Sequence, residues 1–387
     1  MKKLFYFAAA AVALAACAKN EVIPVNSGEN QEITFNVAPK TKADPESKKD
    51  AFSIGKVFAS WAYYLPKDKT WDANSGENYV EPKEYISGAK ISYNTTENVW
   101  KAEKSYYWPK DGGSLTFFAY SLNKDNFDFK TVAAGGSNVT CRSNTGIFAH
   151  IDLSVDKNVD FLVADPAKNK KSNVDEGKHF VDGVPTLFRH KLSYIIFNVK
   201  TDKNYTDAGK TLTLKSIKFN NVSYDGQYRD IASKSPAISA GFTPGAKGAV
   251  NYTGGSTESP FSHVIKSTNS SISSIDNFLY IPQDFEKGSE ATKNAYIEVE
   301  YTITTSKTIT NTEGQKVQQE IVTENVKKQI FLNPADGKGT KIFDKWEMGK
   351  KYTINLTFTL DEILWDPAVQ DWEDVTIGTD ATPIIVG

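Results

Sequence analysis

The carboxylates near the C-terminal end are the side chains in this chain best suited to chemistry. They are interleaved with two tryptophans, Trp365 and Trp372. The acids are Asp361, Glu362, Asp366, Asp371, Glu373 and Asp374. Paired carboxylates beside tryptophan can form a glycoside hydrolase site, and clustered acids can hold calcium. The same pattern fits two strands joined by a turn at Asp366-Pro367, with the tryptophans packed inward and the acids in water. We favour this structural interpretation, because no second acidic cluster supports catalysis.

Histidine adds little further chemistry. The chain has four: His150, His179, His190 and His263. None has a metal-type spacing to another histidine or to a cysteine, and no nucleophile elbow, phosphate loop, dinucleotide or EF-hand motif occurs. His190 stands at the edge of a predicted strand, where a histidine at the rim of the core is the commoner role. We therefore expect no enzyme activity, no metal site and no cofactor.

Cys17 is the one thiol whose surroundings predict a specific modification. Lys2 and Lys3 precede an apolar run over residues 4–16, and Leu14-Ala15-Ala16 lead directly into Cys17. A charged start, a short apolar run and small residues before a cut are the parts of a secretory signal, and the run is too short to span a bilayer. A cysteine directly after the cut indicates a bacterial lipoprotein signal. We expect Cys17 to carry lipid and to anchor the mature chain outside the cytoplasm.

Composition agrees with an exported β-protein. The chain has 387 residues, a formal charge of −2, and 22 Phe, 18 Tyr and 7 Trp. Near-neutral charge argues against nucleic acid as a partner. Only Arg142, Arg189 and Arg229 are arginines, which disfavours sites that read phosphate or carboxylate. Once Cys17 is lipidated, Cys141 has no partner for a disulfide, so stability must come from core burial.

Strand patterns recur from Phe52 onward. Apolar and polar residues alternate over residues 297–303 and, most strictly, over 352–360, as in half-buried antiparallel strands. Over residues 212–219 the apolar phase slips at Lys215-Ser216, which predicts a bulge. Asp-Gly turns separate the runs, and no long amphipathic helix is evident. The predicted fold is all-β, with two tandem antiparallel β-sandwiches.

The predicted domain organisation has four parts. Residues 1–17 are the signal peptide, and 18–50 form a polar tether that contains one isolated strand, with Ile33, Phe35 and Val37 alternating with polar residues. Residues 51–186 form the N-terminal sandwich and 187–387 the C-terminal one, with residues 168–178 read as a charged loop before the boundary.

An ordered set of motifs resembles the fimbrillin family of Bacteroides-type bacteria, the subunits of type V pili. The cysteine signal and the isolated strand are followed by motifs that run over most of the mature chain. These motifs are Trp100, Tyr106-Tyr107-Trp108-Pro109, residues 115–121, residues 187–192, Tyr280-Ile281-Pro282-Gln283, residues 349–356, and Trp365-Asp366-Pro367 through Asp371-Trp372. The resemblance implies two transthyretin-like sandwiches, lipid-anchored export to the outer membrane, and assembly into adhesive fibres.

The resemblance also implies how subunits join. A protease outside the cell removes the first strand, here Ile33, Phe35 and Val37, and a strand from another subunit fills the open groove by β-augmentation. The family's major subunits are cut after arginine, but no arginine precedes Arg142 here. The lysines of the tether are therefore the expected cleavage points: Lys40, Lys42, Lys48 and Lys49. The absence of arginine also favours an anchor or accessory subunit that keeps its lipid.

The C-terminal tail offers a candidate donor strand. Ile384, Ile385 and Val386 are apolar and β-branched, and they follow the last tryptophan motif. They could replace the first strand of a neighbour, or they could dock as an edge strand on their own subunit. The sequence leaves both interpretations open.

Two rival functions remain at this stage. A stand-alone lipoprotein could bind surface glycans through the pairs Tyr63-Tyr64 and Tyr106-Tyr107, although packing between sheets is the commoner use of such residues. A secreted glycoside hydrolase ranks lower. The leading prediction is a pilus subunit whose partners are other subunits, the outer membrane, and a surface glycan or protein.

Overall fold

The computed structural model is built almost entirely from strands. It describes residues 31–37, 55–122, 137–143, 146–172, 183–230, 233–234, 237–238, 240–272 and 275–372. Within these ranges there are strands and two short 3-10 turns, η1 (Gly76–Asn78) and η2 (Thr206–Ala208), but no α-helix. The predicted all-β fold class is thus confirmed.

The N-terminal part is one rolled sheet. Its strand order is β10-β1-β4-β3-β2-β5-β8-β11, with β9 also paired to β5. The bounds are β1 (Phe35–Val37), β2 (Phe58–Leu65), β3 (Lys83–Asn94), β4 (Val99–Ala102), β5 (Ser114–Ser121), β8 (Leu162–Ala164), β9 (Ala167–Lys170), β10 (Val184–Thr186) and β11 (Phe188–His190). Because only Leu187 separates β10 from β11, the two ends of this order lie next to each other in the chain. The sheet therefore curves around an apolar interior that includes Phe35, Phe58, Trp100 and Phe117.

A four-stranded sheet covers the outer face of β2 and β5. Its order is β17-β14-β7-β6, with β6 (Asn138–Arg142), β7 (Gly146–Asp152), β14 (Asp225–Arg229) and β17 (Gly241–Pro244). A second core, with Phe118, Tyr120 and Phe161 among its members, fills the space between the sheets. Strand β5 is consequently buried on both faces.

The C-terminal part is a sandwich of two sheets. One has the order β20-β12-β26-β27, with β21 also on β12, and the other has the order β18-β13-β23-β24, with β19 also on β13. The bounds are β12 (Ser193–Thr201), β13 (Lys210–Ser223), β18 (Lys247–Asn251), β19 (His263–Ile265), β20 (Ser270–Ser271), β21 (Leu279–Tyr280), β23 (Tyr296–Thr310), β24 (Lys316–Phe331), β26 (Lys350–Phe358) and β27 (Ile363–Asp371). Small pairs complete the fold: β15 (Ser233–Lys234) with β16 (Ala237–Ile238), and β22 (Gln283–Asp284) with β25 (Lys345–Trp346).

Local sequence patterns predicted much of this sandwich. The apolar side chains of β26 all face the core of the C-terminal sandwich, as their alternation indicated. These side chains are Tyr352, Ile354, Leu356 and Phe358. The pairing of β13 with β23 shifts between Leu214 and Ser216, which confirms the predicted bulge. The alternation ends at Phe358, two residues before the predicted end.

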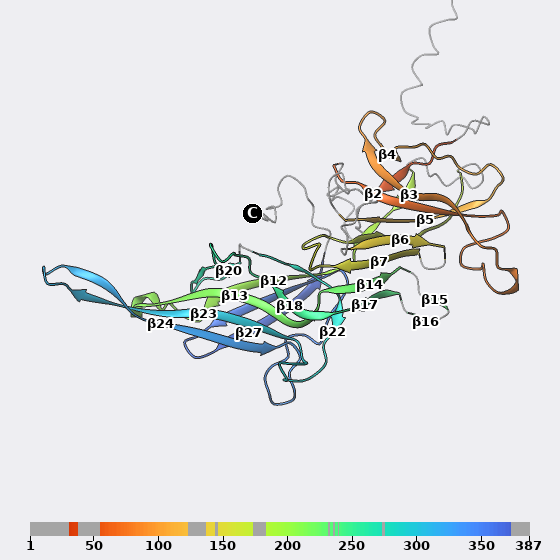
Figure 1. Cartoon of the computed structure of the whole chain (residues 1–387). Coiled ribbons are helices and arrows are strands. Elements are labelled where there is room, and N and C mark those ends of the chain that lie inside the picture. Colours follow the sequence, from red (N-terminus) through yellow and green to blue (C-terminus); the bar gives the residue numbers. More distant parts are fainter. Residues whose placement is uncertain are drawn as a thin grey trace, which may run out of the picture.

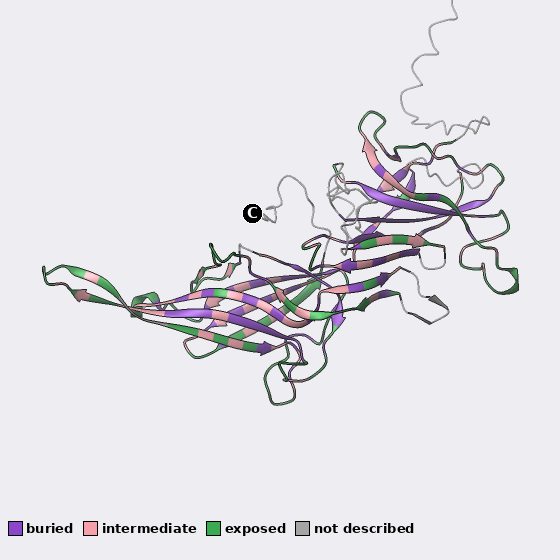
Figure 2. Ribbon diagram, in the orientation of Figure 1, coloured by how far each residue is buried: buried purple, intermediate pink, exposed green. Residues whose placement is uncertain are grey.

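The molecule is elongated, with the rolled sheet at one end and the long β23–β24 hairpin projecting at the other (Figure 1). Buried residues run through both parts and through the region between them (Figure 2). The four-stranded sheet joins β7 to β14 and so crosses the predicted boundary at residue 186. Residues 167–170, read as part of a charged loop, instead form β9. The division into domains at residue 186 stays a prediction, and a cut there would divide a sheet.

Candidate functional site

The first strand lies inside the rolled sheet rather than at its edge. Strand β1 pairs in parallel with β10, with Phe35 opposite Val184 and Val37 opposite Thr186. On its other side Phe35 pairs with Trp100 of β4 in antiparallel fashion. Removing the strand would therefore expose unpaired backbone on two neighbours at once. We call the space filled by residues 31–37, between β10 and β4, the β1 groove.

The side chains of β1 enter the interior of the rolled sheet. Ile33, Phe35 and Val37 are 2%, 3% and 6% exposed. The Phe35 ring packs edge-on against Phe58 at 5.6 Å and Phe117 at 5.9 Å between centroids. Burying three such side chains stabilises the fold by roughly 1.5–3 kcal/mol each. The groove thus holds a strand through a row of alternate apolar contacts.

A second segment pairs with the residues before β1. The Ile33 N–H donates to the Tyr106 carbonyl at 2.7 Å, and the Trp108 N–H donates to the Gln31 carbonyl at 3.0 Å. An antiparallel bridge joins Glu32 to Tyr107 between these bonds. The groove therefore contacts seven residues, 31–37.

Gly183 allows the backbones to approach closely beside β1. Its φ is +92°, and a Cβ there would lie 2.7 Å from the carbonyl carbon of Thr34 and 2.8 Å from the nitrogen of Phe35. The next residue, Val184, donates its N–H to the Thr34 carbonyl at 2.7 Å. Any side chain at position 183 would push the strand out of the groove.

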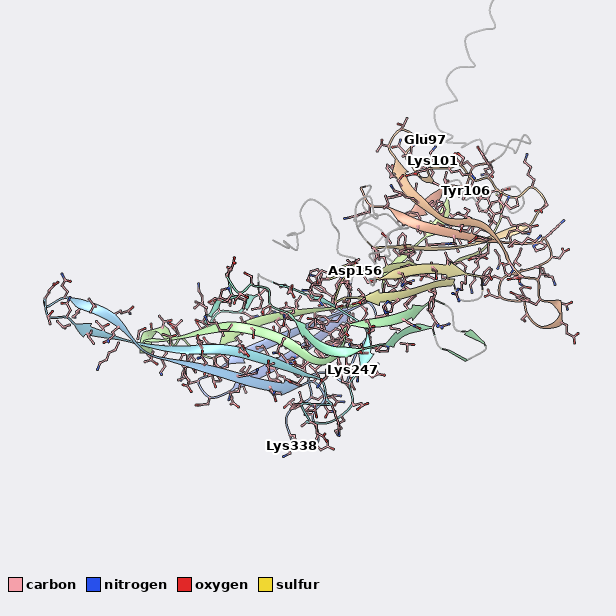
Figure 3. All side chains as sticks on the ribbon, in the orientation of Figure 1. Glu97, Lys101, Tyr106, Asp156, Lys247 and Lys338 are labelled. Atoms are coloured by element: carbon pink, nitrogen blue, oxygen red, sulfur yellow. The ribbon has the colours of Figure 1, made fainter. Side chains whose placement is uncertain are left out.

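The outward side of the β1 groove is polar and carries one cation. Glu32, Thr34 and Asn36 are half-buried on this side. Lys101 of β4 donates to both carboxylate oxygens of Glu97, at 2.6 and 2.7 Å. That hydrogen bond raises the Lys101 pKa, and the negative charge of Glu32 raises it further, so Glu32 lies within electrostatic reach of Lys101. Figure 3 labels Glu97, Lys101 and Tyr106 in this part of the molecule.

Several predicted site residues lie outside the described part of the chain. These are Cys17, the lysines Lys40, Lys42, Lys48 and Lys49, and the tail residues Ile384, Ile385 and Val386. Lipidation, cleavage and strand donation by these residues stay predictions.

The C-terminal acids do not form a catalytic pair among the described residues. Asp366 and Asp371 are exposed on β27, and Asp371 pairs with Lys350. Trp365 packs against the sandwich core, while Glu373 and Asp374 lie beyond the described residues. No cluster of three or more metal-ligating side chains occurs in the ranges that the structure describes.

His190 and Trp372 meet where the rolled sheet joins the sandwich. Their rings stack at 3.7 Å with an interplanar angle of 14°, and Tyr194 lies 5.3 Å from Trp372. The His190 Nδ1 lies 2.9 Å from Asp160 Oδ1. The backbone N–H of Trp372 donates to the Gly349 carbonyl at 2.8 Å. This cluster docks the end of the sandwich on the rolled sheet.

The tyrosines of the sequence pairs Tyr63-Tyr64 and Tyr106-Tyr107 lie in different surroundings. Tyr63 is 5% exposed and donates to the Cys141 carbonyl at 3.0 Å, so it serves packing. Tyr107 is 41% exposed, and its carbonyl accepts a hydrogen bond from Tyr85 at 2.5 Å. Tyr64 donates to Asp111 Oδ2 at 2.7 Å. Only Tyr107 offers a largely open ring.

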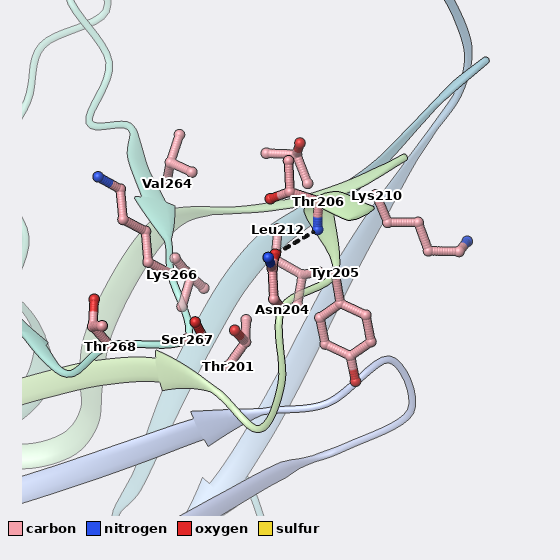
Figure 4. Close-up of a pocket in the computed structure, with 12 residues that line it drawn as sticks. Thr201, Asn204, Tyr205, Thr206, Lys210, Leu212, Val264, Lys266, Ser267 and Thr268 are labelled. Carbon is pink, nitrogen blue, oxygen red and sulfur yellow. Dashed lines mark hydrogen bonds between the residues drawn. The ribbon is translucent and has the colours of Figure 1, made fainter. Parts of the chain in front are cut away.

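A separate pocket of about 320 Å³ lies at the end of the sandwich near the β23–β24 hairpin. It is lined by Tyr205, Leu212 and hydroxyl side chains such as Thr206, with Lys210 and Lys266 on opposite sides (Figure 4). Its lining contains no carboxylate, imidazole or thiol.

No helix among the described residues is long and apolar enough to cross a membrane.

Sequence reasoning missed the residues that build the groove around β1. The sequence marks Asp182-Gly183 as one of several Asp-Gly turns, and no pattern singles out Val184. The parallel pairing of β1 with β10 joins residues about 150 positions apart, which no local pattern reveals. The available signal was the glycine directly before Val184-Pro185-Thr186.

The fimbrillin-like family model matches residues 48–372 of the chain. No curated protein sequence matches it. A solved fimbrial protein from Bacteroides vulgatus is 14% identical, with a TM-score of 0.50, and the match covers 89% of this chain and 100% of that one. A protein described as a cell adhesion protein from Bacteroides uniformis is 16% identical over 89% of this chain and 99% of its own, with a TM-score of 0.45. The tip fimbrial protein Mfa3 from Porphyromonas gingivalis is 12% identical over 82% and 95%, with a TM-score of 0.38.

Proposed function

The chain belongs to the fimbrillin-like family, and we propose that it is a non-catalytic subunit of a surface pilus in which neighbouring subunits are joined by strand donation. The pilus serves adhesion, and its first partner is another subunit. A lipid on Cys17 tethers the exported chain to the outer membrane until it is assembled. The lysines of the tether are the expected cleavage points, and a chain that escapes cleavage acts as the anchor.

The placement of β1 is the observation that carries this proposal. A three-residue strand sits between two partners, and residues 38–54 separate it from the next described residue. Cutting within those residues would leave β1 held only by non-covalent contacts. The family match begins at residue 48, so it does not include β1.

Once vacated, the β1 groove would be unstable while empty. Phe58, Trp100 and Phe117 would lose their cover, and strands β4 and β10 would each have a free edge. Unpaired backbone and exposed aromatic rings both favour insertion of another strand. The donor is the C-terminal tail of a neighbouring copy, within which the sequence analysis offered Ile384, Ile385 and Val386 as one candidate.

A disulfide bond that holds β1 in its groove tests the proposal. Asn36 and Pro185 are partners across the β1–β10 pair, so Asn36→Cys with Pro185→Cys can link the strand to the groove. The test protein is residues 18–387 with Cys141→Ser and a protease site inserted after Lys42. After cutting, the reduced protein should form fibres and the oxidised protein should stay monomeric, as measured by light scattering and electron microscopy.

A matched pair controls for the disulfide itself. Thr353 and Ala368 are partners in the β26–β27 pair, away from the β1 groove. Thr353→Cys with Ala368→Cys should leave assembly unchanged in both redox states. Fibres from the oxidised Asn36–Pro185 variant would rule out strand exchange at this groove.

A further inference from the structure

The β1 groove sets position-by-position requirements that can be compared with the C-terminal tail. It takes seven residues, with apolar side chains at positions 33, 35 and 37 and polar ones at 32, 34 and 36. The backbone of the strand is paired on both sides, so the residues along it must supply N–H groups. Proline has no N–H and is therefore disfavoured in such a central strand.

Residues 373–379 meet most of these requirements in order. Their sequence, Glu-Asp-Val-Thr-Ile-Gly-Thr, aligns without gaps with Gln-Glu-Ile-Thr-Phe-Asn-Val at residues 31–37. Asp374 takes the place of Glu32 and Thr376 that of Thr34, while Val375 and Ile377 fill the places of Ile33 and Phe35 with smaller apolar side chains. Gly378 replaces Asn36, and Thr379 replaces Val37 with a side chain of the same shape.

Residues 382–387 meet fewer of them. Side chains alternate along a strand, so Ile384 and Val386 can enter the groove together only if Ile385 points outward. Pro383 would then stand within the paired strand without an N–H to donate. The segment has six residues and no acid.

We infer that residues 373–379, rather than 382–387, fill the β1 groove of a neighbouring copy. This inference rests on the proposed strand donation and names the segment that performs it. Trp372 is docked on His190 of its own subunit, and Glu373 follows it directly. The donated strand therefore begins at a fixed point, which sets the spacing between subunits.

Two tail variants of the cut chain distinguish the segments. Val375→Asp with Ile377→Asp should slow fibre growth by at least about tenfold, because two carboxylates would enter apolar contacts without partners. Ile384→Asp with Val386→Asp should assemble at the parent rate. A melting temperature equal to that of the parent verifies that each monomer is folded.

The outcomes separate this inference from the proposed function. If only Ile384→Asp with Val386→Asp blocks growth, the terminal segment is the donor and our inference is wrong, while strand donation stands. If neither pair slows growth, or if the cut parent forms no fibres, strand donation by the tail fails as well.

Discussion

Phe35 is the residue on which the retention of β1 depends most. Its ring contacts Phe58 and Phe117 and is 3% exposed. Loss of a buried Phe side chain costs about 3–5 kcal/mol. We expect Phe35→Ala to weaken the docking of β1 in the uncut chain, and the Val184 amide, which donates to Thr34, should then exchange its hydrogen faster. Asn36→Ala, on the outward side, should leave that exchange nearly unchanged; equal effects would mean that apolar contacts do not hold the strand.

Asp230 gives the fold a specific pH dependence. Burial raises its pKa from 3.8 to about 6, partly offset by the charge of Lys191. Its Oδ2 atom is buried without a hydrogen-bond partner among the described residues. A carboxyl whose pKa is higher in the folded state favours folding below the unfolded pKa, and that contribution is lost as pH rises through the folded value.

We therefore predict that the chain loses stability between about pH 4 and pH 6 through this group. Asp230→Asn should raise the free energy of unfolding by about 1–3 kcal/mol at pH 7.5, since one unit of pKa shift corresponds to about 1.4 kcal/mol. The gain should vanish at pH 4. Urea unfolding at both values measures it, with Asp336→Asn on an exposed loop as the control. A gain of the same size at pH 4 would show that ionisation of Asp230 is not the cause.

At the scale of elements, β26 offers the clearest comparison of two faces. Leu356 is fully buried opposite Trp365, while Thr357 lies on the outward face. Leu356→Asp should prevent folding, because burying an unpaired charge costs several kcal/mol. Thr357→Asp should change the melting temperature little. Circular dichroism of both variants tests this, and a comparable loss of strand signal in both would mean that the faces are assigned wrongly.

Strand periodicity explains which elements could be predicted from the sequence. The faces of β26 and the bulge in β13 depend on neighbours within a few residues, and both were predicted correctly. Strand β5 shows no alternation of burial, because it is buried on both faces. The partners of β1 depend on pairing between distant residues, and the composition of a strand does not encode which edge it joins. The groove, as opposed to the strand that fills it, therefore emerged only from the structure.

At the scale of the whole molecule, the two parts are joined by more than a linker. Strands β7 and β14 pair across the predicted boundary, and one core includes Tyr120 from the rolled sheet and Tyr194 from the sandwich. The His190–Trp372 stack adds a further contact. The two parts therefore share a sheet and a core across the predicted boundary.

This junction predicts the behaviour of a chain cut near residue 186. Proteolysis within residues 173–182 should yield two fragments that stay associated in native buffer, because the shared sheet and core remain intact. They should separate only in denaturant. Size-exclusion chromatography of the cut protein distinguishes the cases, with the uncut chain as the reference. Two fragments that elute apart without denaturant would establish independent domains instead.

The most direct test of strand donation is the structure of the assembled fibre. Electron cryo-microscopy at a resolution that shows side chains would identify the strand between β10 and β4 in each subunit. We predict that Phe35–Val37 is absent from that position and that a strand from the neighbouring subunit lies there, paired with Val184 and Trp100. A fibre in which every subunit keeps its own β1 in the groove would contradict the account.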